Sequence, residues 1–189
     1  MNTSRKSRFS LSTMVSCSLL IALEIILSRW FSIQTPIVHI SFAFIPLVLA
    51  AILYGPGWGA AVGGIADFLG AHLFPTGGYF PGFTLTNTLC GMTYGLLLHE
   101  KPGVSFTRTQ RLIRIGIAVV INNLVWQLCL NSFWLVLMGA TSKGYLALLA
   151  VRFVKYLVMI PIQFCLTCLL EGTLVKLLLK HQLHGQTSF

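Results

Sequence analysis

Six apolar runs, separated by tight turns and one longer polar loop, limit what this chain can fold into. Hydrophobic residues make up 56% of its 189 residues and charged residues only 9%, too few charges to cover a water-facing surface. About 20 apolar residues in a helix cross the hydrocarbon core of a bilayer. We therefore predict an all-α integral membrane protein, with residues 1–189 forming a single bundle of six transmembrane helices. The expected helices run from Leu11 to about Phe31, Ile37 to Tyr54, Trp58 to Phe74, Pro81 to Leu98, Leu112 to Met138, and onward from Tyr145.

The positions of the basic residues indicate the orientation in the membrane. The net charge is +9, and most of the positive charges lie in the two tails and in the loop after the fourth run. Lysine and arginine accumulate on the cytoplasmic side of membrane proteins, so we place both termini there. The cytoplasmic parts are a basic tail at 1–10, the loop at 99–111 and an amphipathic tail at 172–189. This distribution favours membrane orientation over nucleic-acid binding. The first run is too long for a signal peptide and lacks a small-residue cleavage site, so we interpret it as a retained helix.

Polar residues around the turn between the third and fourth runs predict a pocket. Asp67 lies in the third run, and Thr84 and Asn87 follow the turn in the fourth. A polar group that faces lipid without a partner costs several kcal/mol. Acids within a membrane are usually functional, so we favour a pocket, although these groups could instead bond neighbouring helices.

The fifth run carries a stripe of amides. Asn123, Gln127 and Asn131 recur at every fourth residue and lie on one helical face, which Trp134 continues and Trp126 flanks. Interhelical bonds of this kind contribute under roughly 1 kcal/mol each in membranes. A polar ligand with several donors and acceptors explains the whole stripe better than stability does.

Three cations lie at or within the outer ends of the helices. Arg29 closes the first run, and the sixth run carries Arg152, with Tyr156 and Gln163 on the same face, and the adjacent Lys155. Long cationic side chains can reach the membrane surface by snorkelling, which is the alternative for both cations of the sixth run. The other interpretation is that they bind an anionic ligand.

Small residues at four-residue spacing predict close helix packing. The third run has such pairs at Gly59 and Gly63 and at Ala66 and Gly70. In the first run, Ser18 and Ala22 make the same pattern. Such pairs let helix backbones approach closely, either within the bundle or against another protein.

The sequence does not point to an enzyme. The only acids are Glu24, Asp67, Glu100 and Glu171, which form no cluster of the kind that hydrolases or metal-dependent lipid enzymes use. The single CxxC motif lacks nearby histidines, so we expect no metal site and no cofactor. No phosphate-binding G-x-x-x-x-G-K-[ST] motif occurs, so the chain cannot use ATP by that route.

Three segments carry a resemblance to a known family. They read LIALEIILSRWFSIQTP, FIPLVLAAILYGPGWGAAVGGIADFLG and FPTGGYFPGFTLTNTLCGMTYG. The chain resembles the substrate-binding S components of energy-coupling factor transporters of bacterial cell membranes, in their folate-specific branch. The resemblance implies an outward-facing vitamin pocket, capped by the loop between the first two helices, in which Gln34 lies. It also implies association with a membrane coupling protein and two cytoplasmic ATPases through small residues of the first helix, which Ser18 and Ala22 match. The family commonly has alanine at both positions, so Ser18 is a mild departure.

The resemblance and the residues agree on the ligand's chemistry. Folate combines a flat pterin with donors and acceptors, an aminobenzoate ring and a dianionic glutamate tail. We expect polar residues to bind the pterin edge, aromatic residues to stack on the rings, and cations to bind the carboxylates. The alternatives are an S component for another vitamin, riboflavin or thiamine, and a membrane enzyme acting on lipid. The candidate ligand-binding residues are Arg29, Gln34, Asp67, Tyr79, Phe80, Phe83, Thr84, Asn87, Asn123, Trp126, Asn131, Trp134, Arg152 and Lys155.

Overall fold

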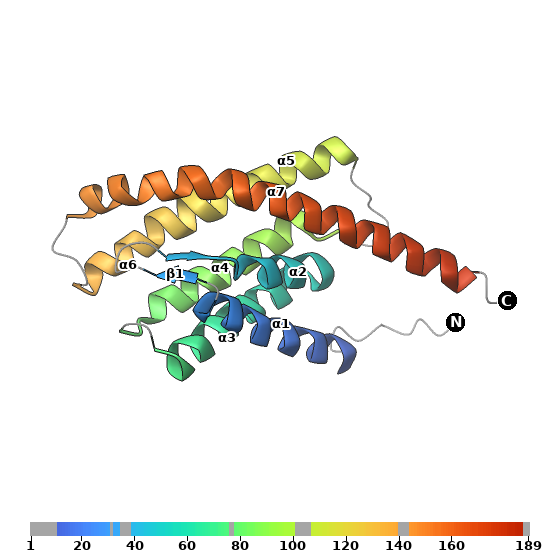
Figure 1. Cartoon of the computed structure of the whole chain (residues 1–189), viewed down its shortest axis with the longest axis horizontal. Helices are drawn as coiled ribbons and strands as arrows, with labels where there is room; N and C mark the ends of the chain where they lie inside the picture. The colour runs from blue at the N-terminus through green and yellow to red at the C-terminus, as the bar shows by residue number, and fades with distance from the viewer. Residues whose placement is uncertain are drawn as a thin grey trace.

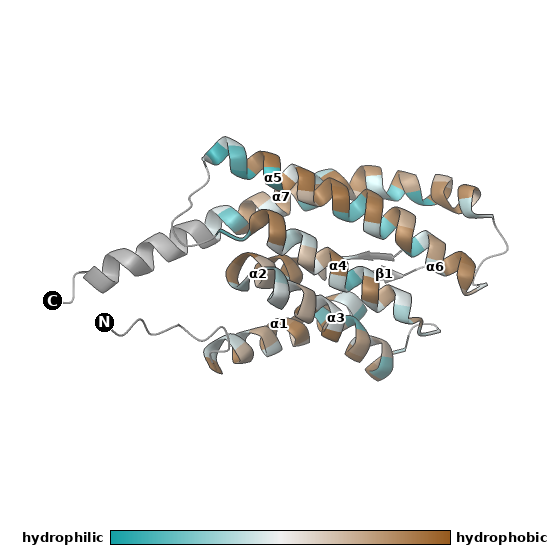
Figure 2. Cartoon of the chain, turned by 180° about the vertical axis from the view of Figure 1, so that it is seen from behind, coloured by the Kyte–Doolittle hydropathy of each residue, from teal (hydrophilic) through white to brown (hydrophobic). Residues whose placement is uncertain are grey.

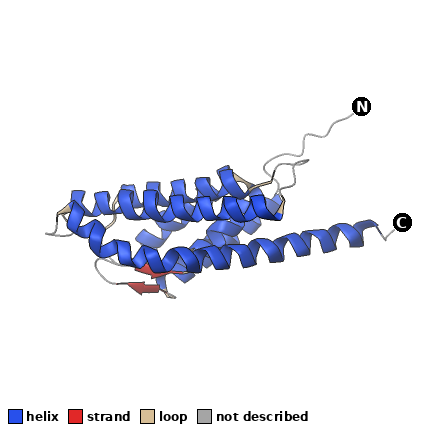
Figure 3. Cartoon of the chain, turned by 90° about the horizontal axis from the view of Figure 1, so that it is seen from above, coloured by secondary structure: helices blue, strands red, loops and turns tan. Residues whose placement is uncertain are grey.

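A computed structural model of the chain describes residues 11–30, 32–34, 39–75, 78–100, 107–139 and 144–186. Its elements are α1 (Leu11–Arg29), β1 (Ser32–Gln34), β2 (His39–Ser41), α2 (Phe44–Tyr54), α3 (Pro56–Leu73), α4 (Pro81–Leu98), α5 (Arg108–Val120), the π-helix η1 (Ile121–Leu130), α6 (Asn131–Leu137) and α7 (Tyr145–Gln186). Since α5, η1 and α6 follow one another without a break, the described residues form six helical segments (Figures 1 and 3). The prediction of an all-α, six-helix bundle is confirmed.

The local sequence explains where the helices begin and end. Gly55 separates α2 from α3 with a φ of 88°, a left-handed conformation that favours glycine. Pro56 and Pro81 open α3 and α4, where the missing N–H of proline costs no helical hydrogen bond. Thr107 and Gln110 form a capping box at the start of α5, which satisfies two backbone N–H groups.

The segment between α1 and α2 differs from the expected loop and early helix. Strands β1 and β2 form an antiparallel hairpin in which Ile33 pairs with Ile40, so the expected helix start at Ile37 is wrong. Isoleucine favours strands because its branched side chain fits a pleated backbone. The Ser41 hydroxyl accepts a hydrogen bond from the Ala43 N–H at 3.0 Å, and α2 starts at the next residue, Phe44.

Close approach of α3 and α4 confirms that the small residues of α3 serve packing inside the bundle. A Cβ added at Gly59 would lie 2.6 Å from the Gly91 carbonyl oxygen, and one at Gly63 would lie 2.6 Å from the Asn87 carbonyl oxygen. A Cβ at Gly91 would collide with the backbone of Gly59 in turn. Only glycine lets the two backbones approach this closely.

The main core lies where α2, α4 and α5 meet. It is built from buried side chains that include Val48 and Ala51 of α2, Tyr94 of α4, and Ile115 and Ala118 of α5. Outside this core, many large apolar residues are exposed, and hydrophobic residues predominate along the helices (Figure 2). Such a surface suits lipid as the solvent.

By length and composition, three described helical stretches can cross a membrane: Leu11–Arg29, Arg108–Leu137 and Tyr145–Thr173. Helix α2, Phe44–Tyr54, is also apolar but is shorter than these three stretches. The first turn of α1 and the C-terminal end of α7 lie at the same end of the bundle, and α7 extends beyond the other helices there (Figure 1).

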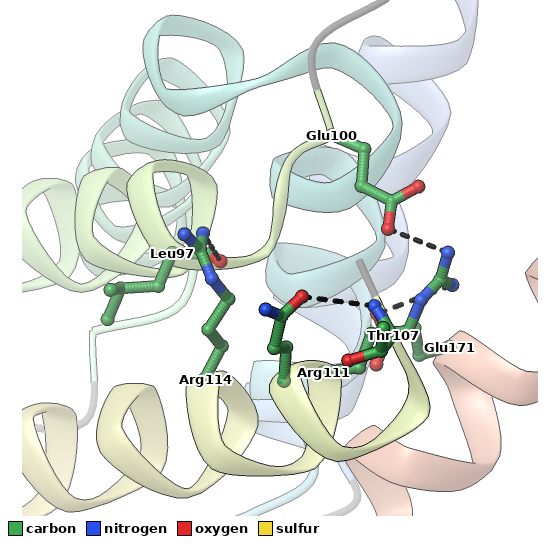
Figure 4. Close-up of polar contacts among 7 residues, drawn as sticks. Leu97, Glu100, Thr107, Arg111, Arg114 and Glu171 are labelled. Atoms are coloured by element: carbon green, nitrogen blue, oxygen red, sulfur yellow. Dashed lines mark hydrogen bonds and ion pairs between the residues drawn. The ribbon is translucent and has the colours of Figure 1, made fainter. Parts of the chain in front are cut away.

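An ionic cluster joins the helices at this end (Figure 4). The Arg111 guanidinium lies 2.7 Å from the Glu100 carboxylate and 3.9 Å from that of Glu171 on α7. Arg114 donates to the Leu97 carbonyl oxygen at 3.1 Å. These contacts tie the C-terminal end of α4 to α5 and α7.

The predicted cytoplasmic segments are only partly described. The basic tail at 1–10 lies outside the described residues, as do residues 101–106 of the loop at 99–111. Of the tail at 172–189, residues up to Gln186 continue α7. Their cytoplasmic location remains a prediction.

Candidate functional site

A polar cluster around the carboxylate of Asp67 lies between α3 and α4. The Thr84 hydroxyl donates to Oδ2 of Asp67 at 2.7 Å, and Nδ2 of Asn87 donates to Oδ1 at 2.8 Å. The Tyr79 hydroxyl lies 3.3 Å from Oγ1 of Thr84. Both oxygens of the Asp67 carboxylate therefore hold α4 against α3, and each has a further lone pair for another donor.

The C-terminal end of α1 lies against this cluster. The Arg29 guanidinium reaches Gly70 of α3, where a Cβ would lie 3.4 Å from Nη2. Arg29 and Asp67 are close enough to interact electrostatically, and Glu24 also lies in the field of Asp67. Glu24 is 6% exposed, and its Oε2 has no hydrogen-bond partner among the described residues. This side of the bundle thus combines one arginine with two acids.

A second polar cluster joins η1 to α4 and α7. Nδ2 of Asn123 donates to Oε1 of Gln163 at 2.6 Å, and Nδ2 of Asn131 donates to Oε1 of Gln127 at 2.9 Å. Nε2 of Gln127 lies 3.9 Å from the Cys90 sulfur. Within the described part of the chain, Oδ1 of Asn131 is buried and accepts no hydrogen bond.

The fifth helix is not regular through this region, which the sequence did not predict. Residues Ile121–Leu130 form a π-helix, a rare conformation that is frequent at functional sites. The carbonyl oxygens of Gln127 and Cys129 accept hydrogen bonds from the hydroxyls of Tyr156 at 2.8 Å and Tyr145 at 3.2 Å. Two tyrosines of α7 thus fix α7 to the backbone of η1.

The two cations of α7, Arg152 and Lys155, lie beside the polar cluster of η1. Arg152 is 4% exposed and donates to the Ser132 hydroxyl at 2.9 Å and to the Tyr156 hydroxyl at 3.4 Å. The Lys155 ammonium lies 4.7 Å from the centre of the Tyr156 ring. Among the described residues, neither cation has a carboxylate partner, because the ion pairs found there all involve Arg111. The burial of Arg152 does not fit snorkelling.

Aromatic side chains pack together where the start of α4 meets α6. The rings of Phe80 and Trp134 have centroids 5.5 Å apart, and Phe83 lies 6.2 Å from Phe80. The indole N–H of Trp134 donates to Thr86 at 3.2 Å. A side chain at Gly82 would collide with Trp134 and Phe80, so glycine allows these rings to gather.

The structure divides the predicted site residues into two groups on opposite faces of α4. Thr84 and Asn87 face α3, whereas Thr86 and Thr93 face η1 and α6, with Thr93 accepting from the Trp126 indole at 3.0 Å. The first group comprises Arg29, Asp67, Tyr79, Thr84 and Asn87. The second comprises Phe80, Phe83, Asn123, Trp126, Asn131, Trp134, Arg152 and Lys155.

Some site residues were missed or are not fully described. Gln34 lies in β1 beside His39 of β2, and its side chain is outside the described part. Ser132, which binds Arg152, was not predicted, because an isolated hydroxyl in an apolar run carries no distinguishing signal. No group of three histidine, cysteine, aspartate or glutamate side chains in the described residues could hold a metal ion.

Comparison with known proteins identifies the class to which this bundle belongs. The model of the family described as "ECF transporter, substrate-specific component" matches residues 12–171. The chain therefore belongs to the substrate-specific components of energy-coupling factor transporters, and it is a multi-pass protein of the bacterial membrane. The family resemblance read from the sequence is confirmed.

Individual relatives within the family are similar over most of the chain. The folate transporter FolT of Clostridium novyi (strain NT) is 38% identical over 151 residues, which cover 80% of this chain and 83% of the relative. The folate transporter FolT of Leuconostoc mesenteroides subsp. mesenteroides is 34% identical over 152 residues, covering 79% and 78%. A crystal structure of FolT bound with folic acid aligns with a TM-score of 0.76 at 31% identity, over 87% of this chain and 95% of that one.

Proposed function

We propose that this chain is the folate-binding membrane subunit of an energy-coupling factor transporter. The observation that carries the proposal is the pair of cations on α7, Arg152 and Lys155, which lie beside the amide cluster of η1 with no carboxylate partner among the described residues. The two similar folate transporters and the similar folic-acid complex support the same ligand.

A buried cation without a counter-ion indicates an anionic ligand. An isolated charge is costly in an apolar setting, and among the described residues Arg152 has hydrogen bonds only to the neutral hydroxyls of Ser132 and Tyr156. The glutamate tail of folate brings two carboxylates. A guanidinium can bind a carboxylate through two parallel hydrogen bonds, and an ammonium binds it as a point charge.

The neighbouring residues suit the ring end of folate. Phe80 and Trp134 offer aromatic faces on which a ring can stack. The free acceptor of Asn131 can receive an N–H of the pterin. Asp67 has spare lone pairs on the other face of α4 and is a second candidate partner for that edge.

Binding of folate by the purified chain, without nucleotide, tests the proposal. We expect saturable folate binding by isothermal calorimetry in detergent, because all the proposed pocket residues come from this chain. Riboflavin and thiamine serve as matched ligands of the same class of transporter. Binding of either, with no binding of folate, would assign the chain to another vitamin.

The exposed face of α1 is the proposed contact with the coupling protein, which would act with two ATPases. Ser18 and Ala22 are exposed one turn apart, and apolar residues such as Val15 and Leu19 are exposed around them. Small residues in an apolar stripe allow close approach of another helix. The tight packing of α3 against α4, by contrast, is internal to the bundle.

Substitution of Ala22 by tryptophan tests this contact. The bulky ring should separate the two backbones and block folate uptake in cells that carry the whole transporter, while folate binding by the purified subunit persists. Leu96→Trp is the control, because Leu96 is 58% exposed on α4. Loss of binding in Ala22→Trp, with assembly retained, would make Ala22 an internal packing residue.

A further inference from the structure

We propose that Tyr156 is a positioning residue that orients both cations of the anion site, Arg152 through its hydroxyl and Lys155 through its ring. The inference rests on the proposed function, since it assigns a role within the folate site. Tyr156 is 2% exposed, so it acts through its neighbours.

The hydroxyl of Tyr156 links Arg152 to the π-helix. Its single proton goes to the Gln127 carbonyl oxygen at 2.8 Å, so its lone pairs are left to accept from Nη2 of Arg152 at 3.4 Å. The Ser132 hydroxyl receives Nη1 of the same guanidinium at 2.9 Å. Two bonds to different helices hold the plane of the guanidinium in one orientation.

This arrangement leaves donors on Arg152 for a ligand. A guanidinium has five N–H groups, and the described residues accept from only two of its nitrogens. The third nitrogen, Nε, is buried without a partner among those residues. A carboxylate binds best to a guanidinium whose direction is already set, because less rotational freedom is lost on binding.

The ring of Tyr156 places Lys155. The ammonium lies 4.7 Å from the ring centre, within the range of a cation–π interaction. This contact orients the lysine without neutralising it, so that its charge remains available to an anion. One tyrosine thus fixes two cations that share no acidic partner in the described part of the bundle.

Tyr156→Phe removes the hydroxyl and keeps the ring. We expect folate affinity, measured by calorimetry, to fall about three- to tenfold, the range of one hydrogen bond. Pteroic acid, which lacks the glutamate tail, should bind the variant and the parent equally. In the Arg152→Ala background, Tyr156→Phe should cause no further loss of folate affinity, because the guanidinium it orients is gone.

Tyr145→Phe is the matched control. Tyr145 also lies on α7 and donates to a carbonyl oxygen of η1, that of Cys129, but it contacts neither cation. Tyr145→Phe should leave the ratio of folate affinity to pteroate affinity unchanged. Ser132→Ala, which removes the second bond to Arg152, tests the same orientation if Tyr156→Phe folds poorly, and it should lower the ratio.

The outcomes separate this inference from the proposed function. Equal weakening of folate and pteroate in Tyr156→Phe and Ser132→Ala would show that these residues support the fold, and would overturn the inference. Unchanged folate affinity in both variants would overturn it too. If the parent protein bound no folate at all, the proposed function itself would fail.

Discussion

Helices α3 and α4 approach each other through glycines, whereas η1 and α7 are joined by polar side chains. In the first region, backbone lies against backbone at Gly59 and Gly91. In the second, Asn123 meets Gln163 and the Tyr156 hydroxyl meets a carbonyl oxygen of the π-helix. At Gly59 and Gly91 the first arrangement leaves no space between the two backbones, while the second brings together donors and acceptors that are only partly satisfied.

The charges of the two regions differ in the same way. Arg29 interacts electrostatically with Asp67, so the region of α1 and α3 can balance its own cation. Arg152 and Lys155 have no acid beside them in the described residues. The comparison suggests that the first region is a close-packed scaffold with an internally compensated charge. We propose that a bound ligand supplies the anion for the second region.

Gly91→Ala should have the largest effect. Its Cβ would collide with the Gly59 backbone, so α3 and α4 would be forced apart at a cost of about 3 kcal/mol or more. Gly116→Ala in α5 is the control, since its Cβ would lie 3.7 Å from Cε2 of Phe164, an ordinary contact. Thermal unfolding in detergent should show a large loss for the first and none for the second. Equal stability would mean that the scaffold tolerates repacking.

Arg152→Ala should weaken folate binding more than Arg29→Ala does. A charge-assisted bond is worth about 1.5 to 3 kcal/mol, or about ten- to a hundredfold in affinity. The Asp67 carboxylate already interacts with the charge of Arg29. Removal of Arg29 should therefore lower folate affinity by less than about tenfold. Arg152→Lys should rescue only partly, because an ammonium lacks the planar fork.

Pteroic acid provides the control for both arginines. It should bind the parent more weakly than folate does, and it should lose little further affinity in Arg152→Ala. Calorimetry with both ligands measures this difference. A larger effect of Arg29 than of Arg152 would place the carboxylate end beside α1 and reverse the comparison.

Asp67→Asn tests the compensated region. The substitution removes the negative charge of the carboxylate that accepts hydrogen bonds from Thr84 and Asn87. It should lower the free energy of unfolding by about 1.5 to 3 kcal/mol. Folate and pteroate should weaken by the same factor, whether Asp67 holds the helices or also binds the pterin. A selective loss of folate would put Asp67 at the tail end of the ligand.

The sequence predicted the helices better than the site. Long apolar runs and the breakers Gly55 and Pro81 fix helix positions locally, and α4 was predicted with its observed ends. The strand pair before α2 was missed, because three-residue strands are too short for a clear alternating pattern, and the pairing of Ile33 with Ile40 is not visible in the local sequence. The π-helix was missed as well, since its residues read as an ordinary apolar helix.

The candidate residues were predicted as one set, whereas the structure arranges them in two groups on opposite faces of α4. A helical repeat shows that Asn123 and Asn131 share a face, yet it cannot show which neighbour that face meets. Asp67 and Asn123 were both candidate ligand-binding residues, and the structure gives them different partners, Asn87 of α4 for Asp67 and Gln163 of α7 for Asn123. Partner choice depends on the packing of helices far apart in the chain, which local pattern does not record.

Glu100→Gln should have the smallest effect of these substitutions. Glu100 follows α4 and pairs with Arg111 of α5, which also neighbours Glu171 of α7. The Glu100 carboxylate pairs with Arg111 at 2.7 Å, but the two side chains are 31% and 20% exposed, and such pairs contribute about 1 kcal/mol or less. Arg111 keeps Glu171 as a neighbour, so α7 should stay in place. We expect a slight loss of thermal stability that shrinks further in high salt, with folate affinity unchanged. A change in affinity would mean that this end of the bundle is coupled to the ligand site, and that the two regions do not act independently.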